Sequence, residues 1–219
     1  MDLVAFGTPL GLAFAAGLNA YLPLLAFALA VHWLHLYSVN PHFAFITQSW
    51  FIAALVILTL LDIAADKLPL IEHLWNAVHT IIRPIAGAIV AVVASSSVLP
   101  GMHIMAATSS SGSGAALVAL SAIPVTGVGL LVILIIMGGV LAALSHTSKL
   151  TARFISTITT AGFLNIVLSL VEDVLVLIVI LLSLFASTIM FILLVLFVLI
   201  FVPRYLRSRN TWVRGPWRR

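Results

Sequence analysis

The chain has 219 residues, of which 63% are hydrophobic and only 7% are charged, and its mean hydropathy is +1.28. A soluble domain carries about 25% charged residues, so this composition excludes a soluble globular protein and predicts an integral membrane protein. The chain contains no cysteine, which excludes disulfide bonds and thiolate-bound metals. The net charge is +4, and six of the ten Lys and Arg residues lie at or after Arg204.

The uncharged segments are continuously apolar rather than alternating, which predicts membrane-spanning helices. A helical span needs about 20 apolar residues. The first candidate, Leu3–Leu36, is too long for one straight helix, and Gly17 and Pro23 interrupt it. We therefore expect a broken helix or a re-entrant piece there. The second candidate span is Ser49–Asp66 and the third is Pro84–Leu99.

Three further candidate spans follow a stretch rich in Gly, Ser and Thr. The fourth, Ala115–His146, is overlong and interrupted at Pro124, the fifth is Phe154–Leu170, and the sixth is Asp173–Val202. The sequence thus predicts an all-α polytopic membrane helix bundle over residues 1–203, with about six crossings, and a basic tail at 204–219. Residues 1–100 and 114–203 form two loosely similar halves. Such repeats are typical of transporters, but this topology would not make the halves inverted.

Positive charge predicts the orientation of the spans, because Lys and Arg concentrate in cytoplasmic segments. Six crossings would place both termini in the cytoplasm, together with the internal cationic residues Lys67, Arg83, Lys149 and Arg153. The basic tail directly follows a span. This position favours contact with anionic membrane lipids over nucleic-acid binding.

Two carboxylates end the second candidate span, in the stretch LDIAADKLP. Asp62 and Asp66 are four residues apart and share one helix face. A carboxylate at the bilayer centre costs roughly 2.5–3.5 kcal/mol on insertion scales. Asp66 and the adjacent Lys67 fit the headgroup zone as well as they fit a functional site. Asp62 lies one turn deeper and should face protein or water, so ion or proton handling is our hypothesis for it.

The stretch LIEHLWNAVHTIIRP predicts an amphipathic helix. Its apolar stripe includes Trp75, and its polar stripe consists of Glu72, Asn76, His79 and Arg83. One interpretation is a helix that lies on the membrane with its polar face in water. The other is that this face lines a cavity and meets the two aspartates, which makes His79 a candidate proton carrier.

Charges of both signs recur in the second half. Lys149 and Arg153 share a helix face, and Arg153 is suited to bidentate binding of a phosphate or carboxylate, although charges also flank spans on their positive side. Glu172 and Asp173 precede the last candidate span, where Ser169 and Glu172 fit a helix-capping box. No motif indicates a cofactor, a metal site or a nucleophile with its base, so an enzyme is not favoured.

The stretches GLNAYLPLL, ADKLP and RPIAG, with the spacings H-x-x-K-x-x-x-R and G-x-x-N-x-x-x-S-x-x-E-D, resemble a family of small bacterial membrane proteins, domain-of-unknown-function family 4126. The resemblance covers about residues 11–181 and leaves the apolar end and the tail outside. It implies a bacterial inner-membrane location but no activity. It also groups these positions as functional candidates: Asn19, Asp66, Lys67, Arg83, Gly87, His146, Lys149, Arg153, Asn165, Glu172 and Asp173.

Two hypotheses of different class follow. In the first, the chain is a small multi-pass transporter or lipid-handling protein whose carboxylates take up protons or cations. Arg83, Lys149 and Arg153 would then hold an anionic small molecule or a lipid phosphate. In the second, the chain is a non-catalytic membrane scaffold or assembly partner whose charges pair structurally. A water-accessible chamber at Asp62 favours the first hypothesis, and a closed bundle favours the second. The oligomeric state stays open.

Overall fold

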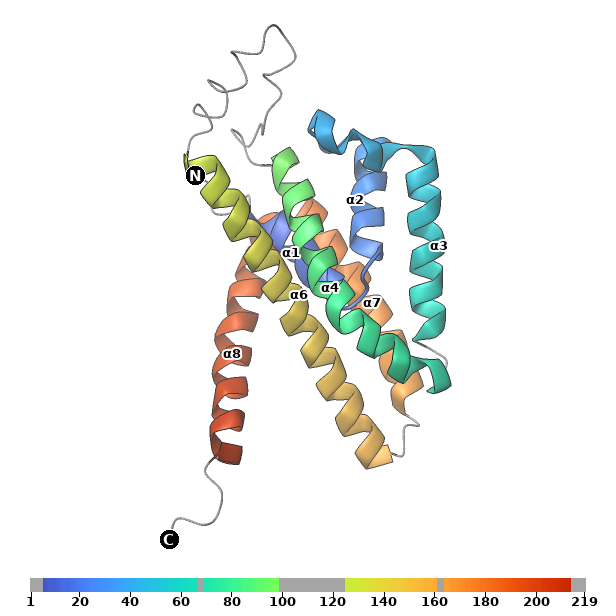
Figure 1. The fold of residues 1–219 in the computed structure, drawn as a ribbon, viewed down its shortest axis with the longest axis vertical. Coiled ribbons are helices and arrows are strands. Elements are labelled where there is room, and N and C mark those ends of the chain that lie inside the picture. Colours follow the sequence, from blue (N-terminus) through green and yellow to red (C-terminus); the bar gives the residue numbers. More distant parts are fainter. Residues whose placement is uncertain (1–5, 67–68, 99–124, 161–163, 214–219) are drawn as a thin grey trace, which may run out of the picture.

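The computed structural model describes residues 6–66, 69–98, 125–160 and 164–213, and all regular elements in these ranges are helical (Figure 1). The predicted all-α membrane bundle is therefore confirmed. The elements in chain order are α1 (Gly7–Ala16), α2 (Leu22–His32), the 3-10 helix η2 (Pro41–Thr47), α3 (Ser49–Ala65), α4 (Pro69–Val98), α6 (Val125–Thr160), α7 (Leu164–Phe185) and α8 (Ser187–Val213).

Four of these helices contain an apolar stretch long enough to cross a membrane. The stretches are Ala77–Ser97 in α4, Gly129–Thr159 in α6, Val167–Phe185 in α7 and Ser187–Arg204 in α8. The 17 residues of α3 follow η2 at a bend of 60°, and this bent pair counts as a fifth candidate span. The outer surfaces of α3 and α8 expose large apolar side chains such as Leu60 and Leu199, as contact with lipid requires.

The first hydrophobic segment is broken into two short helices, as predicted. α1 has 10 residues and α2 has 11, so each is about half as long as the hydrocarbon core of about 30 Å. α1 runs alongside α8 in the same direction, since Gly7 lies against Ser187 and the rings of Phe14 and Phe197 are 4.9 Å apart. α2 then returns toward the start of α3 (Figure 1). The described helices give up to five candidate crossings, close to the six predicted.

Two predicted spans have different boundaries in the structure. The residues of Phe154–Leu170 are not a span of their own, because they belong to the end of α6 and the start of α7. The segment Asp173–Val202 is divided between α7 and α8, with a break at Ala186. Continuous hydrophobicity conceals such breaks, whereas the helix ends are set by packing. The predicted interruption at Pro124 lies outside the described residues.

The centre of the bundle is α1, in which every residue except Phe14 is buried. It contacts α4, α6, α7 and α8. A helix that is apolar on all sides belongs in the interior of a helix bundle, and this explains how ten residues too short to cross the membrane are held at its centre. α4 and α6 cross in front of α1 in Figure 1. The predicted division into two halves stays a prediction.

The crossing of α4 and α6 depends on glycine. A Cβ on Gly87 would lie 2.8 Å from the Gly138 carbonyl oxygen and would overlap Ala142, a close backbone approach typical of membrane helices. We expect Gly87→Leu to separate the helices and to lower the free energy of unfolding by about 1–3 kcal/mol or more, measured by SDS titration in mixed micelles. Gly129→Leu is the control, because Gly129 has open space around it. Equal losses in both variants would contradict the predicted effect.

Candidate functional site

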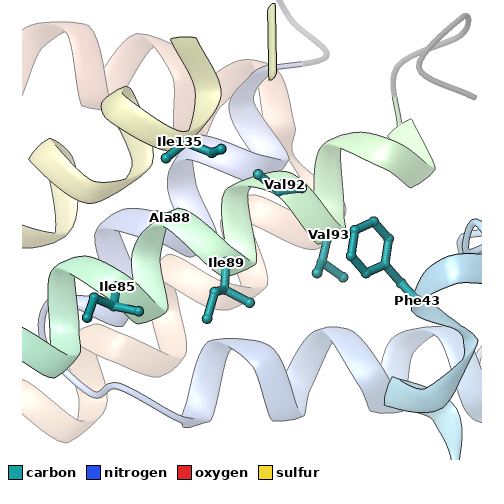
Figure 2. Close-up of a pocket in the computed structure, with 7 residues that line it drawn as sticks. All are labelled: Phe43, Ile85, Ala88, Ile89, Val92, Val93 and Ile135. Carbon is teal, nitrogen blue, oxygen red and sulfur yellow. The ribbon is translucent and has the colours of Figure 1, made fainter. Parts of the chain in front are cut away.

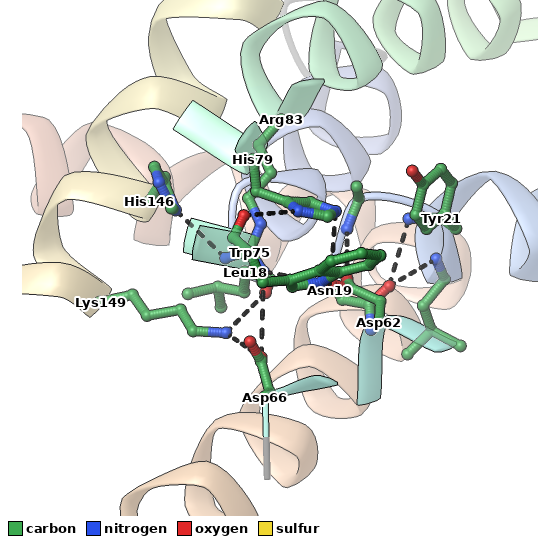
Figure 3. Close-up of polar contacts among 12 residues, drawn as sticks. Leu18, Asn19, Tyr21, Asp62, Asp66, Trp75, His79, Arg83, His146 and Lys149 are labelled. Atoms are coloured by element: carbon green, nitrogen blue, oxygen red, sulfur yellow. Dashed lines mark hydrogen bonds and ion pairs between the residues drawn. The ribbon is translucent and has the colours of Figure 1, made fainter. Parts of the chain in front are cut away.

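Charged and polar side chains of α3, α4 and α6 converge beside the break between α1 and α2 (Figure 3), and Glu172 of α7 joins them. We call this set the buried charge network. Spacings of three or four residues place the members from each helix on one face. The members are Asp62 and Asp66 from the end of α3, Trp75, His79 and Arg83 from α4, His146, Lys149 and Arg153 from α6, and Glu172 from α7.

The network is closed to solvent. Asp62, His79 and Arg83 are 0% exposed, and Lys149 and Arg153 are each 4% exposed. Removing these charges from water costs several kcal/mol per ion unless partners of opposite sign and hydrogen bonds compensate. The compensation therefore has to come from within the network and from the adjacent main chain.

Asp62 is contacted by three side chains of α4 and by the main chain of the α1–α2 break. Its Oδ1 accepts a hydrogen bond from the Trp75 indole at 2.9 Å and lies 3.5 Å from an Arg83 guanidinium nitrogen. The same oxygen is 3.4 Å from Nε2 of His79. Its Oδ2 accepts from the backbone N–H of Ala20 at 3.2 Å. Asp62 thus links α3, the start of α4 and the α1–α2 break.

Asp66 and Glu172 bind the remaining cations. The ammonium of Lys149 lies 2.5 Å from Asp66 and 3.3 Å from Glu172. Arg153 contacts Glu172 through two guanidinium nitrogens, at 2.7 and 3.4 Å, and lies 3.7 Å from Asp66. Arg83 lies 3.9 Å from Asp66 and so connects this group to Asp62.

Within these contacts the charges balance, because three carboxylates face three cations. Asp66 lies just beyond the end of α3. Burial by itself raises the pKa of Asp66, but the positive charges of Lys149 and the two arginines outweigh burial and hold the pKa below its usual value. The ionised carboxylate therefore stabilises the fold above its ordinary pKa, and this contribution is lost as the pH falls through the lowered pKa.

The break between α1 and α2 takes part in the network through its main chain. Arg83 donates to the Gly17 carbonyl oxygen and Lys149 to that of Leu18, each at 3.2 Å. Gly17 lies so close to α6 that a Cβ would overlap the Ser145 hydroxyl, which requires the smallest residue at the break. Asn19 is 5% exposed, and its side chain accepts from the backbone N–H groups of Tyr21 and Leu22, at 3.2 and 2.9 Å. Asn19 therefore holds the start of α2.

The interpretation of LIEHLWNAVHTIIRP as a helix lying on the membrane is wrong. The segment is the first part of α4, which continues through Pro84 as one 30-residue helix. His79 and Arg83 meet the aspartates, as the second interpretation predicted. Trp75 was assigned to the apolar stripe, yet its indole N–H reaches Asp62. An indole N–H needs an acceptor when it is buried, so the sequence could have indicated that Trp75 would reach a polar group.

Other sequence predictions fare differently. Lys67 lies outside the described residues, and of Asn165 only the backbone is described, in the first turn of α7. Asp173 is half-buried on α7. The capping box of Ser169 and Glu172 is wrong, because both residues lie inside α7, which begins at Leu164. Neither residue is at a helix start, and Glu172 instead binds Arg153 and Lys149.

Several polar atoms in or near the network are buried without a hydrogen-bond partner among the described residues. They are Oδ1 of Asp66, Nε of Arg83, Nε2 of His79 and the hydroxyl of Thr59. Buried polar atoms in proteins are nearly always paired. The carboxylate of Asp66 can thus accept one more hydrogen bond, and the guanidinium of Arg83 can donate one more. A small ligand or water is suited to either position, and a proton to the carboxylate.

A separate apolar hollow of about 410 Å³ runs along the opposite side of α4 (Figure 2). Ile85, Ile89 and Val92 form its floor, Phe43 of η2 lies at one end, and Ile135 of α6 lies at one side. Its lining contributes no polar surface. It is therefore suited to a hydrocarbon chain and not to a charged ligand.

A comparison with known protein families shows which family the chain belongs to. A family described as a domain of unknown function, DUF4126, matches residues 6–126 and 110–207. The chain belongs to the DUF4126 family. The match extends through most of α8. The apolar end therefore lies inside the family region, whereas the resemblance seen in the sequence had left it outside. No curated protein and no solved structure gave a match. Membership of DUF4126 therefore supplies no activity.

Proposed function

We propose that this DUF4126 protein is a small multi-pass transporter or lipid-handling protein of the bacterial inner membrane. Its substrate would be an anionic small molecule or a lipid headgroup, and a proton or cation would be coupled to its movement. The observation that carries this proposal is the position of the α1–α2 break, whose main chain contacts Asp62, Arg83 and Lys149.

This arrangement matches charge to the helix ends. The C-terminal end of α1 carries partial negative charge and meets two cations, whereas the N–H of Ala20, just before α2, meets the carboxylate of Asp62. Transporters commonly build ion and substrate sites from such discontinuous helices. Movement of α1 relative to α2 would alter all three contacts together. Charge binding and helix movement are thereby coupled.

Protonation provides the route to anion binding. Lys149 and Arg153 are neutralised by Asp66 and Glu172 in the closed network. A proton taken up by either carboxylate would release positive charge, which an incoming phosphate or carboxylate would then bind. The unpartnered atoms of Asp66 and Arg83 are suited to the first contacts of such an exchange.

The apolar hollow along α4 supports the lipid-handling form of the proposal, because an acyl chain has no polar group to satisfy. We propose that the basic residues from Arg204 onward face the cytoplasm and contact anionic lipid. A cytoplasmic N-terminus was predicted from six crossings. With five crossings, the start of α1 would face the opposite side.

A scaffold or assembly role is the alternative, and the closed state of the network favours it. Three acids balanced by three cations at 0–9% side-chain exposure are what a purely structural network would show. A scaffold would keep these pairs at all times. A transporter would exchange them, so a transport assay distinguishes the two roles.

The test is transport in reconstituted vesicles with two probes, inorganic phosphate and fluorescently labelled phosphatidylglycerol. We expect the wild-type chain to take up phosphate or to flip the labelled lipid. Asp62→Asn and Arg153→Ala should each abolish this activity while the variant chain remains folded. Asn keeps one of the two oxygens that accept from Trp75 and Ala20, so it retains one of these hydrogen bonds and loses the charge. Thr151→Ala is the control, because Thr151 is exposed on α6 and its hydroxyl donates to the Thr147 carbonyl of the same helix. Unchanged transport in both network variants would refute the proposal.

A further inference from the structure

The two buried histidines of the network have opposite hydrogen-bonding patterns. Nδ1 of His79 lies 3.0 Å from the backbone carbonyl oxygen of Trp75. A carbonyl oxygen only accepts, so Nδ1 must carry a proton. In neutral His79 the other nitrogen, Nε2, then presents a lone pair. That lone pair faces Oδ1 of Asp62 at 3.4 Å, and two acceptors facing one another repel.

His146 is fixed in the other form. Its Nδ1 lies 3.1 Å from a guanidinium nitrogen of Arg83. A guanidinium only donates, so this Nδ1 must be unprotonated. The proton of neutral His146 is then on Nε2, which lies 3.3 Å from the hydroxyl of Thr80. A second proton on His146 would break the contact with Arg83, so His146 stays neutral while this contact exists.

The geometry points to a proton-binding site between His79 and Asp62. The bound proton sits on Nε2 of His79, and the imidazolium then donates toward the carboxylate. The oxygens of Asp62 already accept from Trp75, Arg83 and Ala20, so we place the proton on the imidazole. Loss of the proton restores the lone pair and the repulsion. The proton therefore decides whether His79 attracts or repels Asp62.

The surroundings connect this proton to the break. The ring of Tyr21, which follows the break, stands edge-on to the ring of His79 at 6.1 Å. His79 faces Oδ1 of Asp62, and Oδ2 of the same carboxylate accepts from the Ala20 N–H, so His79 is linked to the break through one side chain. The charged and titratable groups that face the pair are Asp66 from α3, Arg83 from α4, His146 and Lys149 from α6, and Tyr21.

The test is ¹⁵N NMR of histidine-labelled full-length protein in lipid nanodiscs between pH 4.5 and 9. His79→Gln and His146→Gln assign the two signals among the seven histidines. We expect His79 to change from imidazolium to a neutral form protonated on Nδ1. Asp62→Asn should weaken proton binding by His79 roughly tenfold or more, because the counter-charge is lost. His146 should remain neutral and protonated on Nε2 throughout.

A neutral His79 protonated on Nε2, a single form of His79 across the pH range, or no effect of Asp62→Asn would each overturn the site. The use of this proton in coupling rests on the proposed transport function, and the two can fail separately. Proton exchange by His79 without phosphate or lipid transport would leave the site and remove the function. Transport in vesicles by a chain whose His79 does not titrate would remove the proton site and leave the proposed function.

Discussion

Replacing Arg83 with leucine is expected to lower the free energy of unfolding by about 3–5 kcal/mol, the range for leaving a buried charge without its partner. The Arg83 side chain is fully buried and contacts the Gly17 carbonyl, His146 and both aspartates. Leucine supplies none of these contacts, and Asp62 would lose its guanidinium partner. SDS titration of the purified chain in mixed micelles measures the loss.

Two comparisons isolate the cause. Arg204→Leu removes an exposed arginine at the end of the apolar stretch of α8 and should change stability little. Adding Asp62→Asn to Arg83→Leu removes the orphaned charge, so the double variant should be more stable than the sum of the single effects predicts, by about 0.5–3 kcal/mol. Additive losses would show that Arg83 and Asp62 are not energetically coupled, and the network would not be a unit.

The convergence of the charges could be anticipated from sequence because lipid tolerates so few of them. Asp62, in a chain that is 7% charged, had to face protein or water, and the polar face that carries His79 and Arg83 was expected to meet it. Helical spacing also placed His79 and Arg83 on one face. The membrane helix class and the break at Gly17 follow from the same simple physics, since both depend on local sequence.

The parts that were mispredicted depend on tertiary packing. Leu170 and Asp173 lie inside α7, because α6 ends at Thr160 and α7 extends from Leu164 to Phe185, and uniform hydrophobicity gives no sign of these helix ends. The start of α4 looked like a surface helix because its polar face could not be matched to its partners without a fold. The role of the Gly17 and Leu18 carbonyl groups was equally hidden, since every residue has such a group.

Access of water to the α1–α2 break would distinguish a working site from a static one. The chain has no cysteine, so a single cysteine can be introduced without altering the background. Ala20 is suitable, because it is 2% exposed and its N–H binds Asp62. In the closed network a cysteine there is shielded. It would react with a membrane-impermeant thiol reagent only when the network opens.

Two further variants set the scale for this experiment. Ala28→Cys lies on α2 at 0% exposure, away from the network, and should not react. Ser49→Cys lies at the exposed start of α3 and should react fully. Both are measured in right-side-out and inverted vesicles with an impermeant methanethiosulfonate reagent, added to one side at a time.

The most direct measurement is therefore the labelling of Ala20→Cys in these vesicles. If the charges surround a chamber that opens during transport, the reagent modifies this cysteine from at least one side, clearly above the level of Ala28→Cys. If Ala20→Cys stays as unreactive as Ala28→Cys from both sides, the network is a permanent structural core and the proposed transport function is contradicted.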